Sequence, residues 1–355
     1  MSQKFPYEWL NQPFAAIDES FAQRAQARQA QLTKPPGSLG RLEDIAIQLA
    51  ALQHTDRPSI DSVHITVFAG DHGIAVENVS AFPQSVTVEM IKNFARGGAA
   101  INALAHSHHA SLEVINLGTV DDTSSITAVK NYHLGRGTAN FLHQPAMTFE
   151  QLESALQIGC DAIDRIQQND QNPLFIGGEM GIANTTSATA LACCALNLPA
   201  ERLTGAGTGL DMQGIAHKTR VIAQALALHC NKVDSPLELL RRLGGFEIVA
   251  LTGAYLRCAQ IGIPVLIDGF ISTVAALMAV SMIPETQRWF IYSHVSEEKG
   301  HRIILQHLNA RPLLDLQMRL GEGSGAAVAI HLLRSACQLH NEMATFSEAA
   351  VSQKI

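Results

Sequence analysis

The feature of this sequence that most limits its fold is a repeated order of short apolar run, glycine-bearing loop and helical segment. Residues 63–69 form a β-branched run that ends at Gly70. Residues 174–176 form a second apolar run, which ends at Gly177 and precedes an Ala-rich helical segment over 187–196. Parallel strands need a crossover connection, and the crossover is usually a helix. The pattern therefore predicts an α/β protein whose parallel sheet carries helices on both faces.

Further segments extend this alternation along the chain. Strands are also predicted over residues 112–117, 264–267 and 289–292. Helical apolar spacing is found over residues 18–32, 40–53, 86–94, 97–105, 149–168, 272–282 and 325–343. We expect one α/β domain over residues 60–310, which binds nucleotide and base, and a smaller helical domain formed by residues 1–59 together with 311–355.

Composition narrows the classes of partner. Apolar residues make up 47% of the 355-residue chain and charged residues 16%, which suits a large core and argues against disorder. The net charge is −7 and no Lys/Arg cluster occurs, so we expect no nucleic acid and no anionic membrane as partner. Residues 261–283 resemble a membrane span, but Pro264, Asp268 and Gly269 interrupt them. A buried strand and a buried helix are expected there instead.

The cysteines and the N-terminus indicate the compartment. The six cysteines show no CxxC spacing and stand mostly in apolar helical segments: Cys160, Cys193, Cys194, Cys230, Cys258 and Cys337. This predicts buried thiols in a reducing compartment, rather than a disulfide framework or a zinc site. The first residues lack an apolar secretory core, which predicts a cytoplasmic protein.

One carboxylate stands among three glycines in the stretch MRLGEGSGA, residues 318–326. Glycines allow a close backbone approach to a ligand, and the helical run that follows at 327–339 would supply a positive helix end. Glu322 in such a loop suits a general base above a bound anionic substrate. An ordinary turn with a surface glutamate explains this stretch equally well.

Two more glycine-rich stretches follow predicted strands or precede helices. GGEMGIANTT, residues 177–186, contains Glu179 and ends in residues that commonly cap helices, and TGAGTG, residues 204–209, precedes a helix with Lys218. Many backbone N–H donors with few ionisable groups suit a phosphorylated ribose. No GxxxxGK[ST] or GxSxG motif occurs, and too little chain follows Gly321 for a dinucleotide-binding unit.

A metal site is a further possibility. If residues 294–301 are helical, His294, Glu297 and His301 share one face, and the Asp71–His72 pair at the end of a predicted strand can join them. Gly300 weakens that helix, and such side chains are common on exposed faces. Asp71 can equally cap a turn.

Several stretches, taken together, resemble one family: the nicotinate-nucleotide–dimethylbenzimidazole phosphoribosyltransferases of cobalamin (vitamin B12) assembly. In order along the chain they are TKPPGSLGRLE (33–43), AGDHGI (69–74), SAFPQ (80–84), GAAINA (98–103), GEMGIANTT (178–186), TGAGTGLD (204–211), LGGFE (243–247), LIDGF (266–270), SHVSEEKGH (293–301) and LDLQMRLGEGSG (314–325). They span almost the whole chain, so the combination is far more specific than any one of them.

The resemblance implies a reaction and a site. Nicotinate mononucleotide would give its phosphoribosyl group to 5,6-dimethylbenzimidazole with inversion at C1′, no cofactor and no metal, and Glu322 would act as the base. The implied nucleotide-binding residues are Glu179, Gly181, Lys218, Gly205, Gly207 and Gly209. The implied base-binding residues are Ser80, Phe82, Gln84 and Met180.

The resemblance also implies a cytoplasmic homodimer with a Rossmann-like large domain and a small helical one. Ala183 and Ala206 depart from the glycine and arginine expected at those positions, and the loss of arginine removes a possible anion contact. Three other functions stay open: transfer to a different acceptor base, binding of nucleotide without turnover, and hydrolysis at a metal held by Asp71, His72, His294 and His301. Glu322 favours an enzyme, because a binding protein needs no carboxylate at the acceptor nitrogen.

Overall fold

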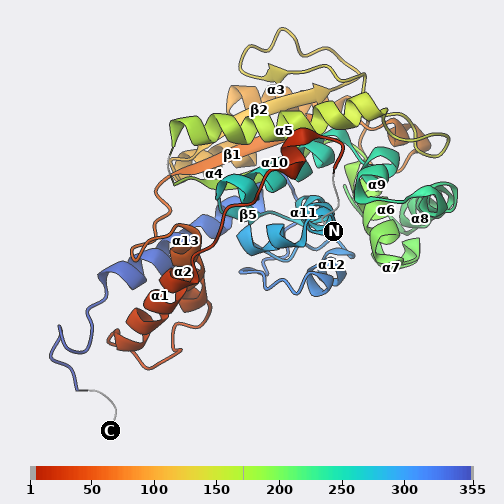
Figure 1. Ribbon diagram of the computed structural model, residues 1–355. Helices are drawn as coiled ribbons and strands as arrows, with labels where there is room; N and C mark the ends of the chain where they lie inside the picture. The colour runs from red at the N-terminus through yellow and green to blue at the C-terminus, as the bar shows by residue number, and fades with distance from the viewer. Residues whose placement is uncertain (1–4, 171, 353–355) are drawn as a thin grey trace.

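A single sheet of six parallel strands organises the computed structural model, which describes residues 5–170 and 172–352 (Figure 1). The strand order is β3-β2-β1-β4-β5-β6, and every neighbouring pair is parallel. The strands are β1 (Val63–Gly70), β2 (Ser111–Gly118), β3 (Lys130–Asn131), β4 (Leu174–Met180), β5 (Val265–Ile267) and β6 (Phe290–Tyr292). This is the Rossmann order, in which the chain reverses its direction of growth between β1 and β4. The predicted parallel α/β sheet is confirmed.

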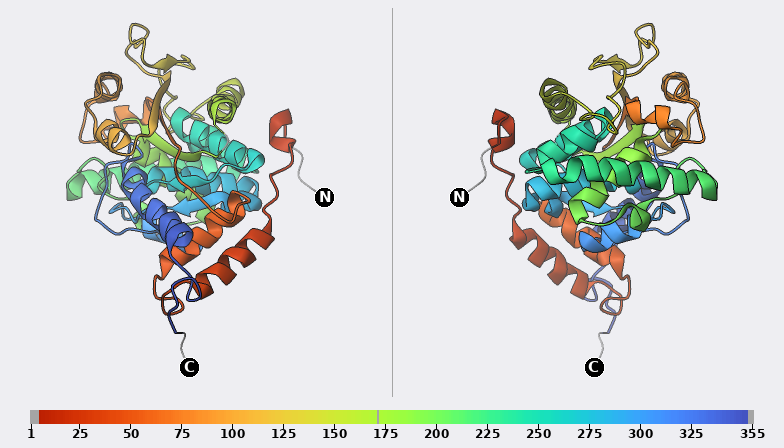
Figure 2. Two further views of the ribbon diagram at one scale, coloured as in Figure 1. Left: turned by 90° about the vertical axis from the view of Figure 1, so that its left-hand side faces the viewer. Right: turned by 90° about the vertical axis from the view of Figure 1, so that its right-hand side faces the viewer.

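Helices cover both faces of this sheet, as expected (Figure 2). They are α1 (Glu19–Gln31), α2 (Arg41–Leu52), α3 (Val86–Arg96), α4 (Ala100–Ser107), α5 (Phe149–Asn169), α6 (Asn184–Leu196), α7 (Ala200–Leu203), α8 (Met212–His229), α9 (Pro236–Leu243), α10 (Phe246–Ile261), α11 (Phe270–Met282), α12 (His301–His307) and α13 (Ser324–Glu342). Short 3₁₀ turns are η1 (Glu8–Asn11), η2 (Gly73–Glu77), η3 (Cys230–Lys232) and η4 (Pro284–Trp289).

The central strand β1 is apolar on both sides because each side meets a different hydrophobic core. Val63, Ile65 and Val67 point to the core built with α2, α3, α4 and α13. Phe68 points to the larger core that contains α5 and α10. A strand buried on both faces reads as a continuous apolar run rather than an alternating one, which is why residues 63–69 were recognisable in the sequence.

Helices α5 and α10 pack closely because two glycines remove side chains from their contact. A Cβ atom on Gly159 of α5 would lie 2.0 Å from the Ala250 carbonyl oxygen, and one on Gly253 of α10 would lie 2.3 Å from the Leu156 carbonyl oxygen. The two helices together cover one face of β1, β2 and β4.

The chain ends form a helical arm. Helix α1 packs on α2, and α2 packs on α13, while Leu32 forms an antiparallel bridge with Thr345 (Figure 1). Helix α13 also contacts α4 and β4, so it belongs to the arm and to the sheet's covering layer at once. The division into residues 60–310 and residues 1–59 with 311–355 remains a proposal.

Several local predictions need correction. Strand β4 continues to Met180, so Glu179 lies on a strand end rather than in a loop. Ala183, with φ 77°, is the N-cap of α6, and the polar residues after it stand inside the first turn, where they do not cap it. Residues 294–300 are not helical, so His294, Glu297 and His301 share no helix face. Helices α7, α9 and α12 and the short strand β3 were not predicted.

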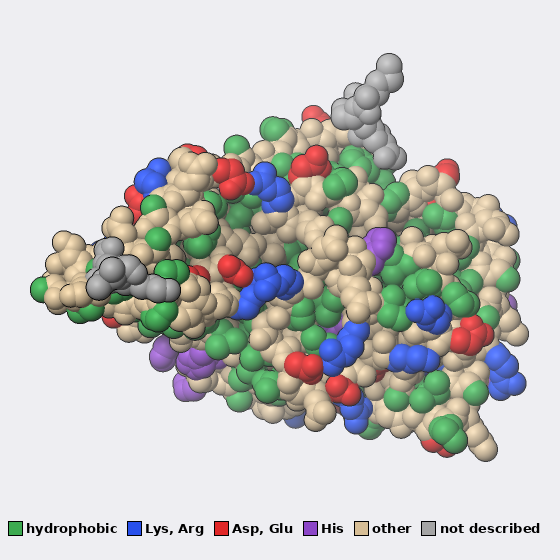
Figure 3. Space-filling view, turned by 90° about the horizontal axis from the view of Figure 1, so that it is seen from below, with side chains coloured by type: hydrophobic (Ala, Val, Ile, Leu, Met, Phe, Trp, Pro, Cys, Tyr) green, Lys and Arg blue, Asp and Glu red, His purple; other side chains and the backbone are tan. Residues whose placement is uncertain are grey.

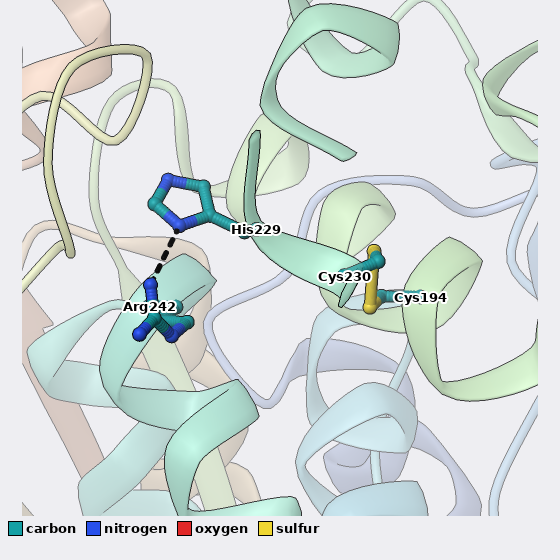
Figure 4. Close-up of a disulfide and its surroundings, with 4 residues drawn as sticks. All are labelled: Cys194, His229, Cys230 and Arg242. Carbon is teal, nitrogen blue, oxygen red and sulfur yellow. Dashed lines mark hydrogen bonds between the residues drawn. A yellow bond between two sulfur atoms is a disulfide. The ribbon is translucent and has the colours of Figure 1, made fainter. Parts of the chain in front are cut away.

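The cysteine prediction is wrong for two of the six. Cys194, near the end of α6, and Cys230, directly after α8, form a disulfide with their Cα atoms 5.8 Å apart (Figure 4). The remaining four are buried free thiols, as predicted. The pairing escaped sequence reasoning because it depends on how α6 and α8 cross.

The apolar segment 261–283 folds as predicted, with β5 and α11 buried in the core. No helix among the residues described has both the length and the apolar character that a membrane span requires. On the face shown in Figure 3, basic and acidic side chains alternate with apolar ones and form no continuous patch of one sign over its described part.

Candidate active site

A cleft of about 360 Å³ opens at the carboxyl ends of the strands. Its walls come from the segments that follow β4, β5 and β6 and from the turn before α13, as expected for a sheet of this topology. The ionisable groups that line it are Glu179, Asp268, His294, Glu298, Arg319 and Glu322. Apolar lining comes from Phe82, Val86, Met90, Met180, Ile182, Phe270, Ile271 and Leu320.

Glu322 is held on the floor of this cleft by an unusual turn. Its φ is 64°, between Gly321 at 87° and Gly323 at 82°. Gly178 of β4 makes room for the turn, because a Cβ atom there would lie 2.4 Å from the Glu322 carbonyl oxygen. The alternative of a surface glutamate is therefore wrong: Glu322 is 5% exposed.

The Glu322 carboxylate suits proton transfer. Its Oε2 atom is buried and has no hydrogen-bond partner among the described residues. Burial and, to a smaller extent, the nearby charge of Asp268 raise the pKa of Glu322, and a backbone N–H bond from Ile101 opposes them. A base of raised pKa is stronger once ionised, and Glu322 lines the substrate-sized cleft.

Asp268, the residue after β5, occupies the N-terminal end of α13. Its Oδ2 accepts a hydrogen bond from the Gly323 amide at 3.2 Å, and its Oδ1 accepts one from the Ala326 amide at 2.8 Å. Sequence reasoning assigned this helix end to a substrate anion, and that expectation is wrong because a protein carboxylate already fills it.

Glu179 lies at the carboxyl end of β4, beside the Glu322 turn. Its Oε2 accepts a hydrogen bond from the Asn184 side chain. A Cβ atom on Gly321 would lie 2.4 Å from its Oε1, so the glycine is needed for the two segments to meet. Burial, followed by the charges of Asp268 and Glu247, raises the pKa of Glu179 well above its ordinary value.

Lys218 of α8 stands directly behind the cleft wall. It is 1% exposed, and its Nζ donates to Thr185 Oγ1 at 2.6 Å. Burial lowers the pKa of Lys218 to about 8, and the nearby Glu298 carboxylate opposes this change. Thr185 and Gly207 line the cleft in front of the ammonium group. Lys218 therefore contributes a positive field behind Thr185 rather than an exposed contact.

The other predicted nucleotide residues divide into two groups. Glu179, Gly181 and Gly207 line the cleft. Gly205 and Gly209 do not line it: Gly205 packs against the Glu298 carboxylate, and a Cβ on Gly209 would meet open space.

The predicted base-binding residues are likewise only partly brought together. Met180 and Phe82 line the cleft, and Phe82 is 50% exposed. Ser80 and Gln84 do not line the cleft. The Ser80 hydroxyl lies 3.1 Å from Oγ1 of Thr208, which does line it, and Gln84 Nε2 donates to the His72 carbonyl oxygen at 3.0 Å.

The predicted metal ligands have other partners. Asp71 Oδ2 accepts a bond from the Val120 amide at 2.8 Å, as the turn interpretation expected. His72 is buried against Glu247, at 2.7 Å, and His301 bonds Thr273 at 2.9 Å. Within the described part of the chain, the side chains spaced to hold a metal ion are Cys160, Asp161 and Asp164, none of which was predicted.

Sequence reasoning missed seven polar or charged cleft residues among those described: Asn184, Thr185, Thr208, Asp268, Ser296, Glu298 and Arg319. A signal existed for Asp268, because it follows a predicted strand just as Glu179 ends one. Ser296 and Glu298 stand in a stretch that was considered for metal binding and for the family resemblance, but neither residue was assigned to the site.

Known proteins with similar sequences or structures all point to one family. The family model described as "Phosphoribosyltransferase" matches residues 14–351. A nicotinate-nucleotide–dimethylbenzimidazole phosphoribosyltransferase of Xanthomonas axonopodis pv. citri is 56% identical over 97% of this chain and 99% of its own length. The protein of that name from Pseudomonas fluorescens is 56% identical over 98% of each chain.

A solved structure shows the same fold. The crystal structure of the enzyme of that name from Thermus thermophilus superposes with a TM-score of 0.88 at 41% identity, covering 95% of this chain and all of that one. Both the sequence and the tertiary structure thus match along the full length. The chain belongs to the nicotinate-nucleotide–dimethylbenzimidazole phosphoribosyltransferase family.

Proposed function

We propose that this enzyme transfers the phosphoribosyl group of nicotinate mononucleotide to 5,6-dimethylbenzimidazole, giving α-ribazole 5′-phosphate and nicotinate. The observation that carries the proposal is the buried Glu322 carboxylate, whose Oε2 has no partner among the described residues and which lines a cleft with an apolar wall. The names of the relatives point to the same two substrates.

The proposed chemistry needs one base and good positioning. A benzimidazole nitrogen attacks C1′ on the face opposite nicotinate, the bond from C1′ to the pyridinium nitrogen breaks, and nicotinate leaves with that electron pair. The configuration at C1′ is inverted from β to α. The other benzimidazole nitrogen loses its proton to Glu322. Because the leaving group is already cationic, the step needs no metal to assist departure.

The lining of the cleft suits both substrates. Phe82 and Met180 offer apolar contact to a heteroaromatic base. Thr185 and Gly207 line the wall with the Lys218 ammonium group behind them, which favours the anionic groups of the nucleotide. Holding both reactants at one carbon can supply about 7–11 kcal/mol of barrier reduction in ideal cases.

We further propose that the enzyme works as a homodimer in the cytoplasm and that the helical arm forms a separate small domain with residues 1–59 and 311–355. The packing of α1 and α2 on α13 supports the domain division. The four buried free thiols support the compartment, although the Cys194–Cys230 disulfide is unusual for it.

The test is a product assay. Purified, chelator-treated enzyme is incubated with nicotinate mononucleotide and 5,6-dimethylbenzimidazole, and mass spectrometry follows α-ribazole phosphate and nicotinate. Formation of both in equal amounts is expected. If neither forms while the nucleotide still binds, the proposed acceptor or the catalytic role is wrong. Parallel reactions with adenine and with unsubstituted benzimidazole determine the acceptor preference.

A further inference from the structure

We propose that Asp268 is a positioning residue that holds the Glu322 turn in its reactive place and orients the base through the backbone on its C-terminal side. The inference rests on the proposed role of Glu322 as the base. It concerns a residue on a different element, because Asp268 follows β5 and Glu322 precedes α13.

The Asp268 carboxylate grips the turn at two points. Oδ2 accepts from the amide of Gly323, the residue directly after Glu322, and Oδ1 accepts from the amide of Ala326. Asp268 is 2% exposed, so water does not compete for these bonds. The two amides bond to separate oxygens of Asp268, and an asparagine side chain offers only one acceptor oxygen.

The turn needs such support because its own residues provide no side-chain cap for the helix. Helix α13 begins after Gly323, which has no side chain to cap the helix. Glu322 has a left-handed backbone, which costs a residue with a Cβ atom roughly 1–2 kcal/mol. A carboxylate from the neighbouring strand end thus supplies the missing cap and fixes a strained conformation at once.

The charge of Asp268 gives the residue a second effect on the base. The charged or titratable residues that line the cleft with Glu322 come from several elements. They are Glu179 of β4, Asp268 after β5, His294 after β6, Glu298 and Arg319, and Lys218 lies behind the cleft wall beside Glu298. His294 Nδ1 lies 3.9 Å from Asp268 Oδ1. Among them, Asp268 is the charge that raises the pKa of Glu322. Removing it should move the acid limb of the kcat–pH profile to lower pH.

The experiment compares Asp268→Asn, Asp268→Glu, Glu322→Gln and the double variant Asp268→Asn/Glu322→Gln with the wild type. Asp18→Asn is the matched control, because Asp18 also caps a helix, accepting from the Ser20 amide at 2.9 Å far along the arm. For each protein, kcat and both KM values are measured across pH, and thermal unfolding checks the fold.

We expect Asp268→Asn to lower kcat on the order of 10–100-fold, as misplacement of a catalytic group does, with the KM for the nucleotide little changed. Its acid limb should move to lower pH, which loss of folded protein alone does not produce. The double variant should be no slower than Glu322→Gln. Asp268→Glu keeps the charge, so its acid limb should stay in place while kcat falls. Asp18→Asn should match the wild type.

Three outcomes overturn the inference. The first is an unchanged kcat in Asp268→Asn. The second is a raised KM for the nucleotide at normal kcat in Asp268→Asn, which would make Asp268 a substrate contact. The third is a double variant much slower than Glu322→Gln. If Asp268→Asn does not fold, an unchanged kcat in Asp268→Glu overturns it instead. If Glu322→Gln turns over at a near-normal rate, Glu322 is not the base, and the inference about Asp268 is wrong as well. If Glu322→Gln is slow but Asp268→Asn is normal, only the inference about Asp268 is wrong, and the base role of Glu322 is retained.

Discussion

At the scale of single residues, Glu322 is a buried carboxylate that is also the proposed base. Glu322→Gln keeps the size and the turn but removes the proton acceptor. We expect kcat to fall about 10²–10⁴-fold, the usual contribution of a general base, while the fold is retained. Steady-state kinetics beside a thermal-unfolding curve checks this. A kcat close to that of the wild type would exclude Glu322 as the base.

Glu179 lines the cleft, and its protonation also affects the free energy of unfolding. Its pKa is raised in the folded protein, so the folded state holds its proton to higher pH than the unfolded state does. The stability linked to this proton is complete below the unfolded pKa, near 4.3, and is lost as pH rises toward the folded pKa. Glu179→Gln should therefore raise the Tm near neutral pH and lose that advantage below about pH 4.

The Glu179 prediction is checked by thermal unfolding of both proteins from acid to neutral pH. Glu297, which is exposed, provides the control variant Glu297→Gln. A Tm difference between wild type and Glu179→Gln that does not depend on pH would show that burial does not hold the proton on Glu179.

At the scale of elements, α6 carries Thr185 on the cleft wall, α8 carries Lys218 behind it, and the two helices are joined twice. Lys218 bonds Thr185 near the cleft, and the Cys194–Cys230 disulfide joins the far ends of the two helices. The bond closes a segment with a sequence separation of 36 that contains the 204–209 loop. Chain-entropy arguments assign such a ring about 3–4 kcal/mol.

Reduction of this disulfide should therefore lower the Tm by about 5 °C for a chain of this length. Differential scanning calorimetry with and without reductant measures it. Cys194→Ser should show the lower Tm in both conditions, and Cys337→Ser, which alters a free thiol, should respond to reductant as the wild type does. An equal Tm for oxidised and reduced wild type would contradict the prediction.

The contact between α5 and α10 is a second element-scale feature. A methyl group on Gly159 would overlap the Ala250 carbonyl oxygen, which is backbone and cannot move aside. Gly159→Ala should lower the free energy of unfolding by about 1–3 kcal/mol, as overpacking does, despite the better helix propensity of alanine.

Urea unfolding measures that loss. Gly214→Ala in α8 is the matched control, because the nearest atom to its new methyl group is the end of the flexible Leu210 side chain. The control should keep its stability or gain some. Equal midpoints for the two variants would mean that α5 and α10 can separate without cost.

At the scale of the whole molecule, apolar side chains remain at the mouth of the cleft. Phe82 is 50% exposed and Leu320 58% exposed, and both line the cleft. Exposed apolar groups of this kind are often covered by a partner or a ligand. We expect light scattering at micromolar concentration to give twice the 38.2 kDa mass of one chain. A mass of one chain at all concentrations would contradict the proposed homodimer.

Local sequence decided the elements, because helix and strand periodicity depend on nearest neighbours along the chain. The run at 63–69 became β1, and the spacing at 149–168 became α5 with one residue added. The Glu322 loop was also visible as a candidate, since three glycines around one carboxylate allow a close backbone approach, although an ordinary turn explained the stretch equally well. The family resemblance was confirmed.

Only the tertiary structure decided which groups meet, because those contacts join segments far apart in sequence. It placed Asp268 on the amides around Glu322 and Lys218 behind Thr185, and it turned Gln84 toward His72 and away from the cleft. It also brought Cys194 to Cys230. Periodicity carries no information about where two strand ends or two helices cross, so the sequence alone determined the parts of the site, and packing determined their geometry.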